Sequence, residues 1–410
     1  MLDGDLVTLT SQIRRRERSA REAVSAALAT LDRFSHLSPV AWRDDPAVLA
    51  RADTADVSTA AGDSLGELHG VPITVKDWID VTGFPCAGGD PAEVDRRPDR
   101  DATAVSRLRA AGAIVVAKTA AGETSSVYGT ARNPWDPGRT PGHSSSGDAI
   151  AVATRAVPLG IGSDSGGSLR FPAHCSGVAA IKPTYGLVPD TGHFPRIDRM
   201  TDGRTVIGPM ARSVADLEVA LRIIAGADGI DPDSPPLGLE PDRSAVHLRV
   251  VAHSDDVIPV DSEMGNLLDR AAAALSATGH DVTQGNVLLP DQALDITQRY
   301  WDRPLHSGEA TEAFLADWQS FRRRAMTLMQ STDVILSPAA PYAAPPIGKS
   351  TDRDWTFTLA PSLWGFPALV VPMGTSIAGL PVGVQIVTGM WKDALALRIG
   401  RSLETTLDYP

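Results

Sequence analysis

Hydrophobic residues recur at three- and four-residue steps through the first sixty positions, with charged residues between them. Such spacing places apolar side chains on one face of a helix. Residues 5–35 are therefore predicted to form two helices divided near Ser19, and a further helical stretch covers 45–62 and ends at Gly62. The first two helices are indicated by Leu6, Leu9, Ile13, Ala23, Val24, Ala27, Leu28 and Leu31.

From residue 71 onward, short apolar runs alternate with stretches of helical spacing. Short apolar strands that alternate with helices predict a mixed or parallel sheet with helices on both faces, so the fold class is α/β. The predicted strands are 71–76, 113–117, 157–161, 248–251, 333–336 and 368–371. The predicted helices are 102–111, 148–155, 214–224 and 264–275.

Segments rich in Gly, Pro and Asp at 226–243 and 338–353 are predicted to be long loops. The first is the only plausible linker, but the strands on its two sides look alike, so one sheet is expected to continue across it. We therefore predict a single large domain. Its expected parts are N-terminal helices (1–62), a catalytic core (63–225), a variable lid or helical region (226–330) and a C-terminal part of the core (331–410).

Composition excludes several classes of partner. With 410 residues and a formal net charge of −12, the chain has no basic stripe with which to bind nucleic acid directly. It has neither an apolar run of membrane-spanning length nor an N-terminal secretory pattern. Its two cysteines, Cys86 and Cys175, have no metal-binding spacing and are expected to be free thiols in the cytoplasm.

Two patches rich in serine and glycine, Gly142–Gly147 and Gly162–Ser168, carry the candidate chemistry. A serine hydroxyl can attack a carbonyl once its proton is removed, and glycine-rich backbone can turn its amides toward an oxyanion. The patches therefore suggest acyl transfer, although a glycine-rich turn capped by serine would have the same sequence. A phosphate loop would require Gly-Lys-Ser/Thr, whereas Leu169 and Arg170 follow the second patch.

A nucleophilic serine requires a base that removes its proton. The nine histidines form no recognisable triad order, and no Gly-x-Ser-x-Gly elbow surrounds Ser168. Lys76 ends the predicted strand 71–76, where burial would lower its pKa and leave it neutral enough to act as a base. An ordinary surface lysine before a turn is the alternative at this point.

The order of these segments resembles the amidase signature family over nearly the whole chain. The resemblance implies the family's single-domain α/β fold and an amide-hydrolysing activity without metal or organic cofactor. It is carried by 133–136, 139–147, 162–173 and 182–186, and by Gly70–Asp77, Ile207–Val214, Ser337–Pro341 and Gly379–Val387.

Specific roles follow from the resemblance. Ser168 would be the acyl nucleophile, and Ser144, expected on a cis peptide bond, would relay its proton to neutral Lys76. Asp164 and Arg170 are expected to brace the nucleophile loop. The oxyanion would be held by the backbone amides of Ser165, Gly166, Gly167 and Ser168.

The first patch departs from the family pattern, which usually reads Gly-Gly-Ser-Ser-Gly-Gly-Ser. His143, Ser146 and Asp148 replace two glycines and a serine, so the pocket and the pKa of Lys76 are expected to differ. The candidates to line the substrate pocket are Trp78, Cys86, Tyr128, His143, His193, Tyr300 and Trp301, with Trp318, Trp355 and Trp364 as further aromatic candidates.

We therefore expect a cytoplasmic amidase that hydrolyses a small-molecule carboxamide or an acyl or aryl amide through a Ser168 acyl-enzyme. Three alternatives stay open: a glutamine-hydrolysing amidotransferase subunit, an esterase, and a catalytically silent binding protein on the same fold. The expected partner is a small-molecule amide, with a homodimer as a further expectation and no membrane contact.

Overall fold

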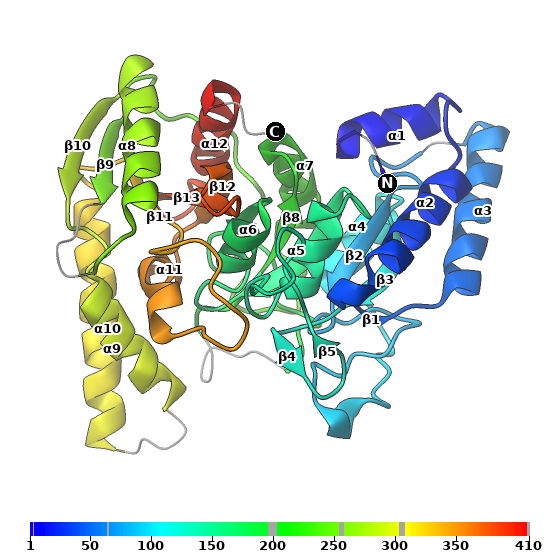
Figure 1. The fold of residues 1–410 in the computed structure, drawn as a ribbon, viewed down its shortest axis with the longest axis horizontal. Coiled ribbons are helices and arrows are strands. Elements are labelled where there is room, and N and C mark those ends of the chain that lie inside the picture. Colours follow the sequence, from blue (N-terminus) through cyan, green and yellow to red (C-terminus); the bar gives the residue numbers. More distant parts are fainter. Residues whose placement is uncertain (3, 64, 196–202, 254–257, 303–307, 408–410) are drawn as a thin grey trace.

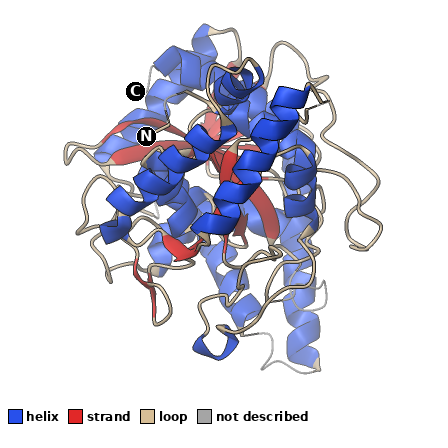
Figure 2. Cartoon of the chain, turned by 90° about the vertical axis from the view of Figure 1, so that its right-hand side faces the viewer, coloured by secondary structure: helices blue, strands red, loops and turns tan. Residues whose placement is uncertain are grey.

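The structure is a computed structural model that describes the chain except residues 3, 64, 196–202, 254–257, 303–307 and 408–410. A mixed sheet of eleven strands runs through the described residues, with helices on both faces (Figures 1 and 2). In order across the sheet, the strands are β1 (Val40–Trp42), β3 (Ile114–Thr119), β2 (Pro72–Lys76), β6 (Leu159–Asp164), β8 (Val206–Ala211), β7 (Ala179–Lys182), β12 (Ala368–Thr375), β13 (Pro381–Thr388), β11 (Val334–Pro338), β9 (Arg249–His253) and β10 (Asp281–Gly285). Two further short strands, β4 (Thr124–Ser125) and β5 (Gly129–Thr130), pair with each other.

The three N-terminal helices form where the hydrophobic spacing predicts them. They are α1 (Leu6–Arg14), α2 (Ala20–Arg33) and α3 (Asp45–Ala61). Ser19 separates the first two because its side chain accepts from the Glu22 amide, while the Glu22 carboxylate accepts from the Ser19 amide. Gly62 ends α3 in a left-handed conformation, with a φ of 77°, which glycine adopts without steric cost.

Two pairs of helices cover the centre of the sheet. Helix α5 packs with α6, and α7 packs with α12. Helices cover both faces of the sheet, so the central strands are buried on both sides (Figure 2). This explains why their sequences are continuously apolar rather than alternating. The remaining helices are α4 (Thr103–Ala110), α5 (Ser146–Ala153), α6 (Arg170–Ser176), α7 (Val214–Ile224), α8 (Ser262–Ala277), α9 (Pro290–Trp301), α10 (Glu309–Leu328), α11 (Thr356–Trp364) and α12 (Asp393–Leu407).

The predicted linker does not divide the sheet. Residues 226–243 contain no helix or strand, yet β8 before them and β9 after them belong to the same sheet, which confirms a single domain. Strands β1, β7, β8, β10 and β13 were not among the predicted strands. Within the described residues, no helix combines the length and the hydropathy needed to cross a bilayer.

Helices α9, α10 and α11 pack together at one end of the molecule (Figure 1). They enclose a hydrophobic cluster of their own, separate from the main core, which includes Tyr300, Phe321 and Trp364. This arrangement matters for function because one face of α9 turns toward the serine- and glycine-rich patches.

Candidate active site

A pocket of about 330 Å³ lies between the two patches and the α9–α11 helices. We call its two sides the inner wall and the outer wall, with Arg204 between them. The inner wall consists of Trp78, His143, Ser144, Ser165, Gly166 and Ser168. The outer wall consists of Leu294, Thr297, Gln298 and Trp301 from α9, Asp352 and Trp355 from a 3-10 turn (Asp352–Trp355), and Leu359 from α11.

Lys76 lies behind the inner wall at the end of β2 and is fully buried. Its Nζ donates to the Ser144 hydroxyl and, at 3.0 Å, to the Ser163 hydroxyl. Burial lowers the pKa of Lys76 to about 7, although Asp148 and Asp164 partly oppose the shift. Burial at the end of β2 therefore favours a neutral Lys76 amine.

Ser144 stands at a sharp turn of the chain before α5. The structure corrects the expected cis peptide bond there: within the described residues the cis bond joins Phe194 and Pro195, and Ser144 instead adopts a φ of 70°. Gly142 permits this path because a side chain there would lie 2.4 Å from the Cα atom of Pro172. The left-handed turn thus brings the Ser144 hydroxyl to Lys76 without the cis bond.

The second patch forms the loop between β6 and α6, and a buried carboxylate organises it. Asp164 accepts from the amides of Gly167 (2.8 Å) and Leu169 (3.1 Å) and pairs with the fully buried Arg170 at 2.9 Å. Asp164 and Arg170 therefore brace the loop, as expected. The charge of Arg170 also holds the pKa of Asp164 at about 2, despite its burial.

The predicted oxyanion-binding set requires a correction at one position. The Gly167 amide is already engaged by Asp164, so it is not free to bind an oxyanion. The amides of Ser165, Gly166 and Ser168 donate to no group in the part of the chain that the structure describes. These three amides border the pocket and are left as the candidate donors.

Arg170 ties this loop to segments far away in sequence. Its guanidinium donates to the Thr358 carbonyl at 2.8 Å, to Gln385 Oε1 at 2.7 Å and to Ser362 Oγ at 2.6 Å. Thr358 in turn donates to the Gly166 carbonyl at 2.6 Å. The loop between β6 and α6 is therefore fixed by α11 and β13 as well as by its own residues, which limits its motion.

Asp148 places a second buried carboxylate near Lys76. It is fully buried on α5 and accepts from Thr74 Oγ1 at 2.8 Å, and Thr74 lies two residues before Lys76 on the same face of β2. Burial raises the pKa of Asp148 to about 7, while Thr74, Thr119, Lys76 and Lys118 favour its charged form. The expected influence of this residue on Lys76 therefore has a structural basis.

The pocket contains only some of the predicted lining residues. Trp78, His143 and Trp301 line it, as does Trp355 among the further aromatic candidates. Its described lining does not include Cys86, Tyr128, His193 or Tyr300, nor Trp318 and Trp364. These positions therefore stay predictions that this pocket does not support, because residue type alone does not show which way each element faces.

Four of these candidates outside the described lining make contacts with other parts of the protein. The Cys86 thiol donates to the Asp77 carbonyl at 3.1 Å, and the Tyr128 hydroxyl donates to the Asp77 carboxylate. His193 meets the Trp78 ring edge-on. Tyr300 is buried, with Trp301 and Trp318 edge-on to its ring and the Arg204 guanidinium 4.0 Å from its ring centre.

Arg204 and most of the outer wall were not predicted from the sequence. Arg204 is fully buried and donates to Ser165 Oγ at 3.2 Å and to Thr297 Oγ1 at 3.1 Å, so it connects the nucleophile loop to α9. The α9 residues could have been found from Trp301, because positions three, four and seven residues before it share its helix face. Those positions are Gln298, Thr297 and Leu294.

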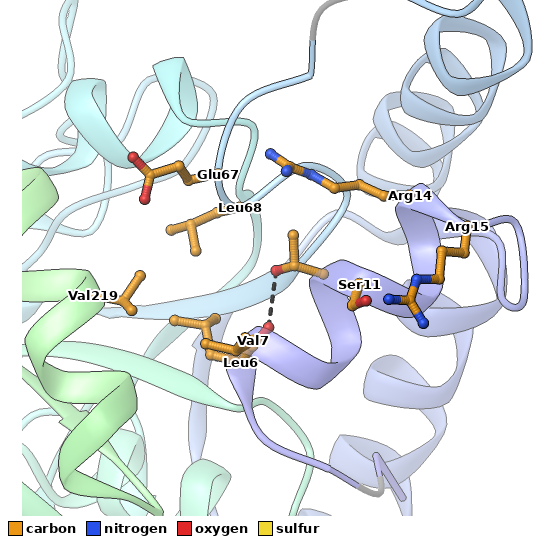
Figure 3. A pocket seen from close by; sticks show the side chains of 9 residues that line it. Leu6, Val7, Ser11, Arg14, Arg15, Glu67, Leu68 and Val219 are labelled. Carbon is orange, nitrogen blue, oxygen red and sulfur yellow. Dashed lines mark hydrogen bonds between the residues drawn. The ribbon is translucent and has the colours of Figure 1, made fainter.

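A second hollow of about 340 Å³ lies between α1, α7 and the segment before β2 (Figure 3). Two of its charged groups have protein partners: Arg14 donates to the carbonyls of Leu65 and Gly66, and Glu67 pairs with Arg222 at 2.5 Å. It contains none of the predicted catalytic residues. Among the described residues, no group of three or more His, Cys, Asp and Glu side chains is placed to hold a metal ion.

Comparison with known proteins defines the class to which this site belongs. The family model described as Amidase matches residues 22–306 and 301–397. The chain is 30% identical to one subunit of the glutamyl-tRNA(Gln) amidotransferase of Chloroflexus aurantiacus, over 94% of this chain and 91% of the relative. It is 32% identical to the indoleacetamide hydrolase of Bradyrhizobium diazoefficiens, over 94% and 83%.

A solved structure agrees with these relatives. The peptide amidase of Stenotrophomonas maltophilia superposes with a TM-score of 0.84 at 25% identity, over 99% of this chain and 97% of that one. The chain therefore belongs to the amidase family, which confirms the resemblance. It is a hydrolase that acts on C–N bonds.

Proposed function

We propose that the protein is a serine amidase in which Ser168 attacks the amide carbon, and Ser144 relays the proton of Ser168 to Lys76. The observation that best supports this proposal is the buried Lys76 amine, which is bonded to the Ser144 hydroxyl behind a pocket that Ser144 and Ser168 both line. A lysine with a pKa of about 7 can accept a proton at neutral pH.

In the acylation step, the Ser168 oxygen forms a bond to the amide carbon. Its proton passes to Ser144 while the Ser144 proton passes to the Lys76 amine, which becomes an ammonium. The carbonyl electrons move to oxygen, and the amides of Ser165, Gly166 and Ser168 stabilise the resulting oxyanion. One such donor is typically worth about 3 kcal/mol of activation free energy.

The intermediate then collapses and the C–N bond breaks. Ser144 donates its proton to the leaving nitrogen and regains one from Lys76, so the amine leaves neutral and Lys76 is neutral again. Water then attacks the ester that links the acyl group to Ser168, and the same relay takes up its proton. The bond between the acyl carbon and the Ser168 oxygen breaks, and the relay returns that proton to Ser168. The products are the carboxylic acid and the amine, and no cofactor takes part in any of these steps.

The pocket favours a small amide that carries a flat, apolar group. Trp78 lies on the inner wall, and Trp301, Trp355 and Leu359 lie on the outer wall, so aromatic faces border the volume on both sides. A volume of about 330 Å³ suits a small ligand. The indoleacetamide hydrolase among its relatives is named for a compound of this kind.

The test is mass spectrometry of reactions with a panel of primary and secondary amides, including aryl acetamides, benzamides and glutamine. Wild type should release acid and amine from the aryl members, and Ser168→Ala should release neither. Equal turnover by both proteins would contradict the assignment of Ser168. Matched esters added to the panel compare amidase with esterase activity.

An amide-transfer role is the second candidate, because the amidotransferase subunit of Chloroflexus aurantiacus is 30% identical to this chain. The aromatic pocket lining argues against glutamine, whose side chain is polar throughout. Ammonia release from glutamine only when a partner protein is added would favour this role. Hydrolysis of aryl amides by the isolated chain would favour the first candidate.

A further inference from the structure

His143 is the residue of the first patch that changes the pocket most directly. It lies between Gly142 and Ser144, at a position where the family pattern usually has glycine, and its ring lines the pocket. The ring is stacked at 17° to Phe171 and meets Trp355 edge-on at 5.1 Å between ring centres. These contacts hold the imidazole in one orientation beside the reacting residues.

One ring nitrogen of His143 faces a buried carboxylate. Nε2 lies 3.9 Å from Oε2 of Glu123, whose side chain is only 8% exposed. The other oxygen of Glu123 accepts from the Gly348 amide at 2.9 Å, which fixes the carboxylate. Nε2 and Oε2 are both buried and make no hydrogen bond within the described part of the chain. Buried polar groups without a hydrogen bond destabilise the folded state, and functional sites are where they are tolerated.

The remaining edge of the ring is open to the pocket. Nε2 is buried, yet 29% of the His143 side chain is exposed, so the exposed part is the part that faces the cavity. Two carboxylates face the ring, Glu123 from the segment before α5 and Asp354 from the 3-10 turn. Burial outweighs both and lowers the pKa of His143, so the imidazole is neutral at pH 7.

The position of Glu123 decides the tautomer of a neutral His143. A carboxylate beside Nε2 favours the form that carries the hydrogen there, because that hydrogen points at the negative charge. Nδ1 is then an acceptor with a free lone pair. A glycine at this position would offer the pocket no such group.

We propose that His143, oriented by Glu123, is a specificity-determining residue whose Nδ1 accepts a hydrogen bond from an N–H or O–H group of the substrate close to the scissile amide. This inference rests on the proposed amidase function and narrows its substrate class. The preferred amides would carry both an aromatic group and a hydrogen-bond donor next to the carbonyl or on the amide nitrogen. A site built around an acceptor discriminates strongly against a ligand that lacks the matching donor.

The experiment uses aryl acetamide pairs that differ by one methyl group, with O–H against O–CH3 next to the carbonyl and N–H against N–CH3 on the amide. The kcat/KM ratio within each pair is measured for wild type, His143→Phe and His143→Asn. Phenylalanine keeps the stacking on Phe171 but has no nitrogen, whereas the asparagine amide can place an acceptor near the position of Nδ1.

Wild type should prefer the donor member of at least one pair by about 10-fold or more. His143→Phe should reduce that preference to about 3-fold or less, and His143→Asn should keep most of it. Glu123→Gln should also keep it, because the side-chain oxygen of glutamine can still face Nε2 and favour a hydrogen there, and Glu123→Leu should weaken it. If His143→Phe fails to fold, the two Glu123 variants test the same role of His143. The preference for the donor member should then be lost in Glu123→Leu and retained in Glu123→Gln.

Unchanged ratios in His143→Phe and Glu123→Leu, with turnover that still depends on Ser168, would overturn the role of His143 alone. Turnover of both members of each pair by Ser168→Ala would instead overturn the proposed function. The two failures are therefore distinguishable in one set of assays.

Discussion

The two walls of the pocket differ in how they are held. The inner wall rests on fully buried charged groups, Lys76, Asp164 and Arg170, whose hydrogen bonds reach α11 and β13. The outer wall consists of one face of the amphipathic helix α9, a short turn and Leu359 of α11, and its Trp301 remains 57% exposed. The inner wall is rigid because moving it would leave buried charges without their partners. Side chains of the outer wall can be substituted with little loss of stability.

This contrast suggests that the two walls have different roles in the reaction. The inner wall would carry the bond-making groups, which must be positioned to within a fraction of an ångström to react. The outer wall would select the substrate, because its side chains can vary without disturbing the ion pairs behind the nucleophile. Substitutions in the two walls should therefore differ both in the kinetic constant they change and in their effect on stability.

The largest expected effect comes from Lys76→Met, which removes the proposed base. We expect kcat/KM to fall at least about 10³-fold, within the range typical of lost general-base catalysis. The pKa of Lys76 is about 7 when folded, against an ordinary value of 10.5, so the native state disfavours the charged amine. The wild type therefore loses stability as the pH falls from about 10.5 towards 7.

A neutral methionine has no such penalty, so the variant should be at least as stable as wild type at about pH 7, and its advantage should shrink as the pH rises towards about 9. Denaturant unfolding at both pH values measures this difference. A variant that loses both activity and cooperative unfolding would instead make Lys76 a structural residue.

Arg170→Met should have the next largest effect, on folding rather than on the chemistry alone. It leaves Asp164 buried without its charged partner, and removing one member of such a pair typically costs about 3–5 kcal/mol. The midpoint of urea unfolding measures the loss. Arg299→Met is the matched control, because Arg299 is about one-third exposed and pairs with Asp295 and Asp317 on the outside of α9. The contrast between the walls predicts a loss below about 1 kcal/mol there.

Trp301→Ala tests the outer wall. Its indole covers part of the pocket, so we expect KM for aryl amides to rise about 10-fold, which corresponds to about 1.4 kcal/mol of lost apolar contact. The value of kcat and the unfolding midpoint should change little, because the ring is mostly exposed. A fall in kcat with unchanged KM would indicate that Trp301 takes part in the reaction steps, and would contradict the separate roles proposed for the two walls.

The smallest effect is expected from Asp148→Asn, which changes the charge next to the base. The proposed reaction requires neutral Lys76, so the rate should fall on the acid side as the pH drops through about 7. An ionised Asp148 raises the pKa of Lys76. Removing the Asp148 charge should therefore move the acid-side fall in rate to lower pH by roughly one unit or less. Asp393→Asn is the control, because this buried carboxylate bonds to Thr184. Its substitution should leave the pH of the acid-side fall in rate unchanged. A shift to higher pH would contradict the proposed coupling.

Much of the inner wall could be predicted from the sequence. The lysine at the end of a buried strand, the two serine patches and the brace of Asp164 and Arg170 all follow from local pattern together with the resemblance. The backbone conformation at Ser144 and the hydrogen bond from the Gly167 amide to Asp164 could not be predicted. Each depends on contacts with segments distant in sequence or on a backbone angle. The outer wall was missed for a different reason: the sequence placed α9 only within a lid or helical region over 226–330, with no bounds for the helix and no indication of which face meets the pocket.

The central claim is that Ser168 forms the acyl-enzyme, and covalent labelling tests it most directly. Wild type, Ser168→Ala and the neighbouring control Ser165→Ala are incubated with a serine-reactive phosphonofluoridate, and their intact masses and digested peptides are measured. We expect one adduct on the peptide that contains Ser168 in wild type and Ser165→Ala, and none in Ser168→Ala. An adduct on Ser144, or an unchanged adduct in Ser168→Ala, would contradict it.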